Sequence, residues 1–160
     1  MQVQKRDGQL EDLNIDKLHK VVMYAVEGIT GVSASEVEIN SHIQFFDRIS
    51  SIDIQETLIK SAADLISEES PNYQYVGGRL INYHLRKEVY GTFTPPCLCD
   101  IIDKNIDIGF YDKEFTELYT KDEINQLQEY IDHARDEYLT YAAMEQFRGK
   151  YLVQNRATGE

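Results

Sequence analysis

Apolar residues recur every three or four positions along much of this chain, a spacing that predicts amphipathic helices separated by polar breaks. The first of these helices begins after Asn14, whose side chain is a good helix cap, and ends at Gly28. Before it, Asp7–Gly8 is the dipeptide most typical of a tight turn between two short strands. We therefore expect a β-hairpin that carries Lys5 and Arg6 on a strand, followed directly by a helix.

A second, shorter helix is expected after Ser33. Ser33 and Glu36 have the spacing of a capping box, in which the two side chains satisfy each other's backbone donors. The apolar residues Ile39, Ile43 and Phe46 follow and predict the buried face of this element.

Two longer helices complete the first region. One begins at Ser50 or Ser51, either of which is suited to cap it, and the other begins near Pro71 and ends at Gly91. Residues 1–92 are thus predicted to form a mainly α domain in which a small β-hairpin caps a four-helix bundle.

Residues 93–149 are predicted to form a second helical region. The apolar spacing restarts there beyond Pro95–Pro96. Thr120 and Glu123 form a second capping box, which begins the longest predicted helix, ending near Gly149.

Residues 150–160 are predicted to begin a hairpin that is completed elsewhere. Tyr151–Val153 has the composition of a strand and Thr158–Gly159 that of a turn, but no return strand follows. A lone strand leaves its backbone groups unpaired. We therefore expect either a cut chain or a subunit that is completed by a separate polypeptide.

The composition narrows the classes of partner. The chain has 160 residues, a formal net charge of −12 and no apolar run long enough to span a bilayer. The negative charge argues against general binding to nucleic acid, whose affinity depends on Lys and Arg that neutralise phosphates. Cys97 and Cys99 lie too close together for an unstrained disulfide, and no second Cys or His pair completes a zinc site. We expect a cytoplasmic protein without membrane or nucleic-acid partners and without a metal site of its own.

Cationic side chains from distant segments are candidates for one anion-binding site. Lys5 and Arg6 belong to the hairpin, Lys17 to the start of the first helix, and Arg86–Lys87 to the end of the fourth. If the hairpin caps the bundle, these groups meet beneath it and suit a triphosphate, with His84 as a further contact. The alternative is that they are ordinary solvated side chains, which are common on protein surfaces.

Ordered motifs run along the whole chain in a single register. They are Val3-x-Lys5-Arg6-Asp7-Gly8 with Glu11, Asn14 and Lys17, then Thr57 to Ile66, Pro71 to Tyr75, His84-Leu85-Arg86-Lys87-x-x-Tyr90-Gly91, Pro95–Pro96, Tyr111–Asp112, Ile131 to Asp136, and Gly149 to Glu160. In this combination the chain resembles the ATP-cone domain, and the helical region that follows it, in the large subunit of aerobic (class Ia) ribonucleoside-diphosphate reductase.

The resemblance implies an allosteric nucleotide site. In that family the cone binds ATP as an activator and often dATP as an inhibitor, and so sets overall activity in making deoxyribonucleotides for DNA synthesis. Carried over by position, the expected site residues are Lys5, Arg6, Glu11, Asp12, Leu13, Asn14, Ile15, Asp16, Lys17, Ser51, His84 and Lys87. Glu11 and Asn14 would pair with the adenine edge. Lys5, Arg6 and Lys87 would neutralise phosphates, with Mg²⁺ sharing the charge.

Two positions depart from the family pattern. Ser51 stands where a threonine is usual, which keeps the hydroxyl group. Gln55 stands where some relatives have a histidine near the phosphates, and this leaves open whether dATP inhibits.

The resemblance also implies that no catalytic residue is present in this chain. The family's reaction uses cysteines in a large barrel, and Cys97 and Cys99 do not match those positions. His133, Arg135 and Asp136 are interpreted as a charged helix face with local ion pairs. The expected partners are the remaining barrel portion of the large subunit, if it is separately encoded, and the radical-generating small subunit.

Two rival interpretations come from other classes. The first is a free-standing nucleotide-sensing regulator, but such regulators place a four-cysteine zinc ribbon before the cone, and this sequence has none. The second is a helical interaction module whose cone no longer binds nucleotide.

Overall fold

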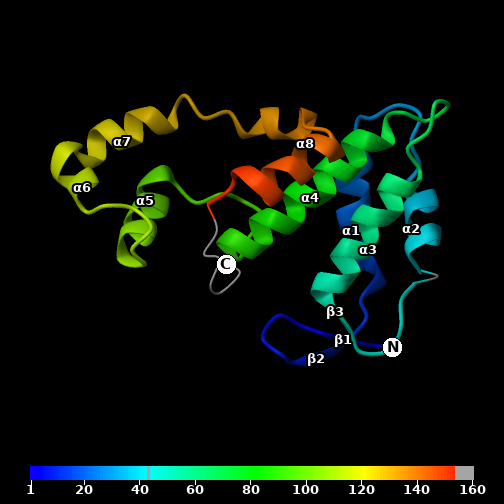
Figure 1. Cartoon of the computed structure of the whole chain (residues 1–160). Helices are drawn as coiled ribbons and strands as arrows, with labels where there is room; N and C mark the ends of the chain where they lie inside the picture. The colour runs from blue at the N-terminus through cyan, green and yellow to red at the C-terminus, as the bar shows by residue number, and fades with distance from the viewer. Residues whose placement is uncertain (43, 154–160) are drawn as a thin grey trace. The chain divides into compact units, whose positions relative to one another are not determined.

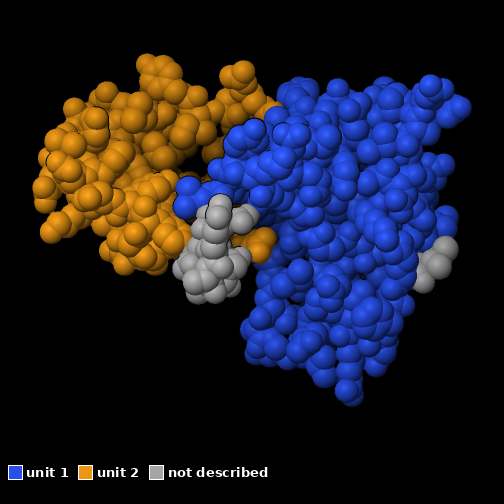
Figure 2. All heavy atoms as spheres, in the orientation of Figure 1, with its two compact units in different colours: residues 1–85, 136–160 blue, residues 86–135 orange. Residues whose placement is uncertain are grey.

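The described residues fold into a mainly helical structure, as the hydrophobic spacing predicts, with a small sheet. The computed structural model describes residues 1–42 and 44–153. Two compact units divide the chain: unit 1 contains residues 1–85 together with the segment that begins at Asp136, and unit 2 contains residues 86–135 (Figure 2). Each unit is described by itself.

The sheet of unit 1 has three short strands in the order β2-β1-β3. β1 (Gln2–Gln4) pairs antiparallel with β2 (Leu10–Asp12) and parallel with β3 (Ile49–Ser50). The predicted hairpin is confirmed, with Gly8 at a φ of +83°, which glycine adopts without strain. The sequence pattern did not predict β3.

Four helices of the first region follow the predicted order (Figure 1): α1 (Ile15–Val26), α2 (Ala34–His42), α3 (Ser51–Asp64) and α4 (Tyr73–Tyr90). Asn14 caps α1 by accepting a hydrogen bond from the backbone N–H of Lys17, as expected. Ser50, not Ser51, caps α3 by accepting from the N–H of Asp53.

The core of unit 1 is one continuous apolar cluster. It draws on the sheet, on all four of these helices and on one later helix, and its members include Val3, Val22, Val37, Ile49, Leu58, Tyr73, Leu80, Ile81 and Met144. The sheet lies at the end of the bundle where α1 and α3 begin (Figure 1). The core therefore supports the hairpin from beneath.

Helix α2 buries a different face from the one the sequence predicts. Val37 and Ser41 are buried, whereas Ile39 is 65% exposed and Phe46, beyond the end of the helix, is 61% exposed. Ile43 lies outside the described residues. The predicted capping box is also replaced, because the Tyr73 hydroxyl accepts from the N–H of Ser33 and donates to the Glu36 carboxylate.

The segment after residue 136 returns to α4. The Arg79 guanidinium, almost buried, donates to the carbonyl oxygens of Glu27 at 2.6 Å and Glu137 at 3.3 Å. A Cβ atom on Gly78 would lie 2.0 Å from the carbonyl oxygen of Leu139, so only glycine permits this approach. Helix α8 (Tyr141–Gln146), capped by Thr140, and the π-helical turn Phe147–Tyr151 follow beside α4 (Figure 1).

Unit 2 is smaller. It contains α5 (Leu98–Asp107), α6 (Glu114–Leu118) and α7 (Lys121–Gln128), and its core consists of Cys99, Ile102 and Ile124. The capping box of Thr120 and Glu123 is confirmed. The single long helix expected to follow it is wrong: α7 ends at Gln128, and a 3₁₀ helix spans His133–Tyr138 before α8.

The terminal strand is not observed in the part of the chain that is described. Tyr151 belongs to the π-helical turn, and Leu152 and Val153 are outside any strand. The predicted turn at Thr158–Gly159 lies outside the described residues. The predicted domain boundaries at residues 92 and 149 stay predictions. No helix within residues 1–42 and 44–153 is both long and apolar enough to cross a membrane.

Candidate functional site

The hairpin turn presents Lys5 and Arg6 at the surface. Both residues lie in the turn between β1 and β2, not on a strand as expected, because β1 ends at Gln4. The Lys5 ammonium lies 3.5 Å from the Asp7 carboxylate. The pKa of Asp7 is lowered by a hydrogen bond from the backbone N–H of Gln9, and the charge of Lys5 acts in the same direction. The turn is thus a small, solvent-exposed array of charges.

Arg6 reaches helix α4. Its Nη2 atom lies 3.5 Å from Nδ1 of His84, which is 78 positions away in the sequence and only 5% exposed. The adjacent Tyr83 has a raised pKa because of its burial, an effect that the positive charge of Arg6 opposes. Two of the predicted phosphate contacts, Arg6 and His84, are therefore brought together by the fold.

The predicted segment Glu11–Lys17 connects β2 to the first turn of α1. The segment runs from strand to helix. Glu11 and Asp12 are the last residues of β2, and Leu13 and Asn14 form the link. Ile15, Asp16 and Lys17 begin the helix. The Lys17 ammonium lies 3.6 Å from the Glu11 carboxylate. Both residues face solvent at the end of the bundle that carries the sheet.

Ser51 is the first residue of α3, directly after its cap. The parallel register pairs Gln4 with Ser50, so α3 begins beside the point where the hairpin turn leaves β1. A helix start of this kind leaves backbone N–H groups without helical partners. The start of α3 therefore adds backbone donors near Lys5, although Asp7 and Asp53 place carboxylates beside them.

Lys87 occupies the last turn of α4, three residues after His84 and partly buried. Residues at this spacing share a helix face. Lys87 belongs to unit 2, whereas Lys5 belongs to unit 1, so the expectation that both bind the same ligand stays a prediction.

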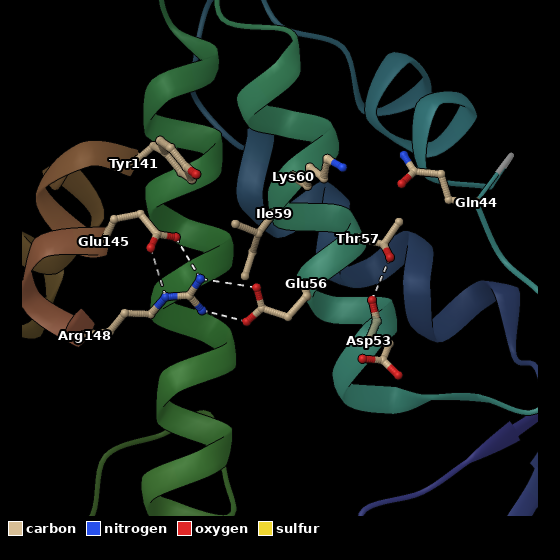
Figure 3. Close-up of a pocket in the computed structure, with 9 residues that line it drawn as sticks. All are labelled: Gln44, Asp53, Glu56, Thr57, Ile59, Lys60, Tyr141, Glu145 and Arg148. Carbon is tan, nitrogen blue, oxygen red and sulfur yellow. Dashed lines mark hydrogen bonds and ion pairs between the residues drawn. The ribbon is translucent and has the colours of Figure 1, made fainter. Parts of the chain in front are cut away.

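The sequence interpretation missed two side chains in this region: Glu56, which contacts His84, and Arg148, which contacts Glu56. Oε1 of Glu56 lies 3.5 Å from Nε2 of His84, and Arg148 forms a fork on Glu56 with distances of 2.6 Å and 3.2 Å (Figure 3). Glu56 and Arg148 are 92 positions apart. No local spacing links residues so far apart, which is why the sequence pattern did not reveal the pair.

A pocket of about 440 Å³ opens beside this pair (Figure 3). Its lining comes from α3, α8 and their neighbours and consists of Gln44, Asp53, Glu56, Thr57, Ile59, Lys60, Tyr141, Glu145 and Arg148. The pocket lies wholly within unit 1.

Cys97 caps a helix and Cys99 is buried in the core of unit 2. Sγ of Cys97 accepts a hydrogen bond from the N–H of Asp100 and so caps α5. Burial raises the pKa of the Cys99 thiol, which makes it a poor nucleophile near neutral pH. No group of His, Cys, Asp or Glu suited to hold a metal ion occurs among the described residues.

Comparison with known proteins identifies the fold of the first region. Residues 1–88 match the family model described as the ATP cone domain. The whole chain is also similar to part of much longer proteins. It is 53% identical over 158 residues to ribonucleoside-diphosphate reductase 1 subunit alpha of Escherichia coli (strain K12), covering 99% of this chain and 21% of that protein.

Two further relatives show the same relationship. The chain is 51% identical to ribonucleoside-diphosphate reductase 1 subunit alpha of Salmonella typhimurium, over 99% of this chain and 21% of that protein. It is 51% identical to ribonucleoside-diphosphate reductase subunit alpha of Haemophilus influenzae, over 100% of this chain and 21% of that protein. The chain thus spans about a fifth of the length of these relatives, in their N-terminal region.

These matches confirm the resemblance predicted from the ordered motifs. The hairpin, the helix that follows it and the contact of Arg6 with His84 all fall inside the matched residues. The chain belongs to the ATP cone domain family.

Proposed function

We propose that residues 1–88 bind an adenine nucleotide, ATP or dATP, as an allosteric effector, and that the chain is the regulatory N-terminal part of a ribonucleoside-diphosphate reductase large subunit. The observation that carries this proposal is the match of residues 1–88 to the ATP cone domain. The similarity of the remaining residues to reductase alpha subunits supports the choice of enzyme.

The triphosphate binds at the hairpin turn and the start of α3. Lys5 and Arg6 supply positive charge, Ser51 supplies a hydroxyl group, and Lys87 and His84 complete the contacts from α4. The Lys5 to Asp7 pair is exposed at both ends, so it costs little to exchange for a phosphate. Mg²⁺ bound to the phosphates shares the remaining charge.

The adenine base binds along Glu11–Lys17. The Asn14 side-chain oxygen is engaged in capping α1, whereas its NH₂ group is the donor available to the base. The Glu11 carboxylate, 3.6 Å from Lys17, is an acceptor for the exocyclic amine of adenine. A link between strand and helix, held at both ends, positions these groups with little further ordering.

Reduction of the ribose takes place outside this chain. We assign it to the portion of the large subunit that corresponds to the remaining length of the relatives, whether or not it is separately encoded, acting with a radical-generating small subunit in the cytoplasm. The chain contributes regulation to that oxidoreductase.

Calorimetric titration of this chain with Mg·ATP and Mg·dATP tests the proposal. We expect the Lys5→Ala/Lys87→Ala variant to bind at least about tenfold more weakly than the wild type, because each lysine neutralises phosphate charge. Lys60→Ala/Lys113→Ala, which removes two exposed lysines outside the site, is the matched control and is expected to bind like the wild type. Absence of binding by the wild type would refute the proposed function.

A further inference from the structure

A continuous chain of polar contacts leads from the hairpin turn to the C-terminal segment of unit 1. Arg6 contacts His84 at 3.5 Å, and His84 contacts Glu56 at 3.5 Å. The Arg148 guanidinium donates hydrogen bonds to the carboxylates of both Glu56 and Glu145. This series of contacts runs from the β1–β2 turn through α4 and α3 to the turn after α8, and Figure 3 shows its last part, in which Arg148 contacts Glu56 and Glu145.

The direction of the hydrogen bonds is set by chemistry. A guanidinium group only donates, so Nδ1 of His84 accepts from Arg6. The neutral imidazole then carries its proton on Nε2, which faces the Glu56 carboxylate. Glu56 thus selects the tautomer that receives Arg6, in the way that a carboxylate orients the ring of a histidine elsewhere.

Arg148 controls how much negative charge Glu56 presents to this site. Its guanidinium forms a two-point contact with Glu56 and a second one with Glu145, where the distances are 3.3 Å and 2.8 Å. Arg148 is 27% exposed, so its charge is less screened than that of a fully solvated arginine. Without Arg148 the Glu56 carboxylate would repel an anion approaching His84 and Arg6.

We propose that Glu56 and Arg148 are positioning residues for the phosphate end of the nucleotide site, and that they couple its occupancy to the order of residues 141–151. This inference rests on the proposed function. Arg148 neutralises Glu56, Glu56 holds His84, and His84 aligns Arg6. Because coupling between two sites is reciprocal, bound nucleotide in turn stabilises the contact of Glu56 with Arg148 and hence the turn after α8.

A double-mutant cycle with Mg·ATP calorimetry tests the coupling. Arg148→Met is expected to weaken ATP binding about fivefold or more, because Glu56 is then uncompensated. Glu56→Gln removes the charge but keeps a side-chain oxygen that can accept from Nε2 of His84, so it is expected to weaken ATP binding less than Arg148→Met does. In the Glu56→Gln background, Arg148→Met is expected to cause no further loss.

Matched variants separate this mechanism from a general loss of positive charge. Lys60 lines the same pocket and is exposed, so Lys60→Met removes one positive charge without touching the chain of contacts. We expect it to leave ATP affinity within about twofold of the wild type. Arg148→Lys keeps the charge without the two-point geometry and is expected to lie between the wild type and Arg148→Met. An equal loss from Arg148→Met in both backgrounds, or an equal loss in Lys60→Met, would overturn the inference.

Hydrogen exchange provides a second measurement. Saturating ATP is expected to slow exchange of the backbone amides of residues 141–151 in the wild type and in Lys60→Met, but not in Arg148→Met at saturation. If wild-type protein binds ATP and these amides do not respond, the coupling is wrong while the nucleotide site stands. If wild-type protein binds no ATP, the proposed function fails and takes this inference with it.

Discussion

The two units of this protein differ in how much apolar surface each one buries. The core of unit 1 includes Val22, Leu58 and Leu80, each with 0% exposure. In unit 2 only Cys99, Ile102 and Ile124 form the buried core, while Leu118 is 66% exposed. Burial of apolar surface is the main source of folding free energy. Unit 1 therefore buries enough apolar surface to fold by itself. Local unfolding of unit 2 is expected to require less free energy than unfolding of unit 1.

The largest expected effect is in the core of unit 1. Leu58→Ala is expected to lower the free energy of unfolding by about 4 kcal/mol, because it removes a fully buried side chain and leaves a cavity. Urea denaturation measures the change. Ile39→Ala, at a position 65% exposed, is the control and should change stability by less than about 0.5 kcal/mol. Equal losses would show that α2 buries the face predicted from sequence.

The next effect tests whether the segment after residue 136 belongs to unit 1. Gly78→Ala is expected to cost about 3 kcal/mol, since its Cβ would lie 2.0 Å from the backbone oxygen of Leu139 and displace that segment from α4. Thermal unfolding, read with hydrogen exchange of residues 139–151, measures it. Gly149→Ala is the matched control, because a Cβ there meets nothing within 4 Å. A wild-type stability for Gly78→Ala would contradict the close approach.

A smaller effect is expected in unit 2. Ile102→Ala should lower the free energy of local opening by about 2 kcal/mol and speed exchange of amides within α5 and α7 only. Ile108→Ala, at a residue 54% exposed, is the control. Faster exchange throughout α1 and α3 would show that the two units unfold together.

The smallest effect is the pH dependence of the α7 cap. Hydrogen bonds from the backbone N–H and hydroxyl of Thr120 lower the pKa of Glu123 below its ordinary value of 4.5. A carboxylate whose pKa is depressed by folding stabilises the native state above the unfolded pKa, and this contribution is lost as the pH falls through the folded pKa. Helicity of α7, followed by exchange or NMR, should therefore decrease below about pH 4.5. Glu123→Gln should remove this part of the pH dependence.

Local chemistry was enough to predict several elements. Asp7–Gly8 specifies the hairpin, and Asn14 specifies the start of α1. Thr120 and Glu123 specify the start of α7. Each of these signals acts on backbone groups within a few residues. The apolar spacing of α1 is likewise met by burial of Leu18, Val22 and Ala25.

The predictions made from residue spacing were wrong where contacts between distant segments determine the local structure. Tyr73, from α4, replaces the capping box of Ser33 and Glu36. The predicted long helix ends at Gln128, and Leu139 and Tyr141 lie against the glycines of α4. Each failure involves a partner that is distant in sequence.

The candidate site divides in the same way. The sequence made Lys5, Arg6 and Lys17 candidates for an anion site, and the family resemblance favoured them over ordinary solvated side chains. Glu56 and Arg148 were not, since their roles depend on a contact that spans 92 positions.

The sequence by itself determined that the chain is mainly helical and that it opens with a charged turn before a capped helix. Only the tertiary structure decided that Arg6 meets His84 and that His84 leads through Glu56 to Arg148. The physical reason is the distance along the sequence between the groups that interact. Turns and caps are closed by hydrogen bonds between near neighbours, whereas a buried histidine and the ion pair beside it require α3, α4 and the segment after α8 to be folded against one core.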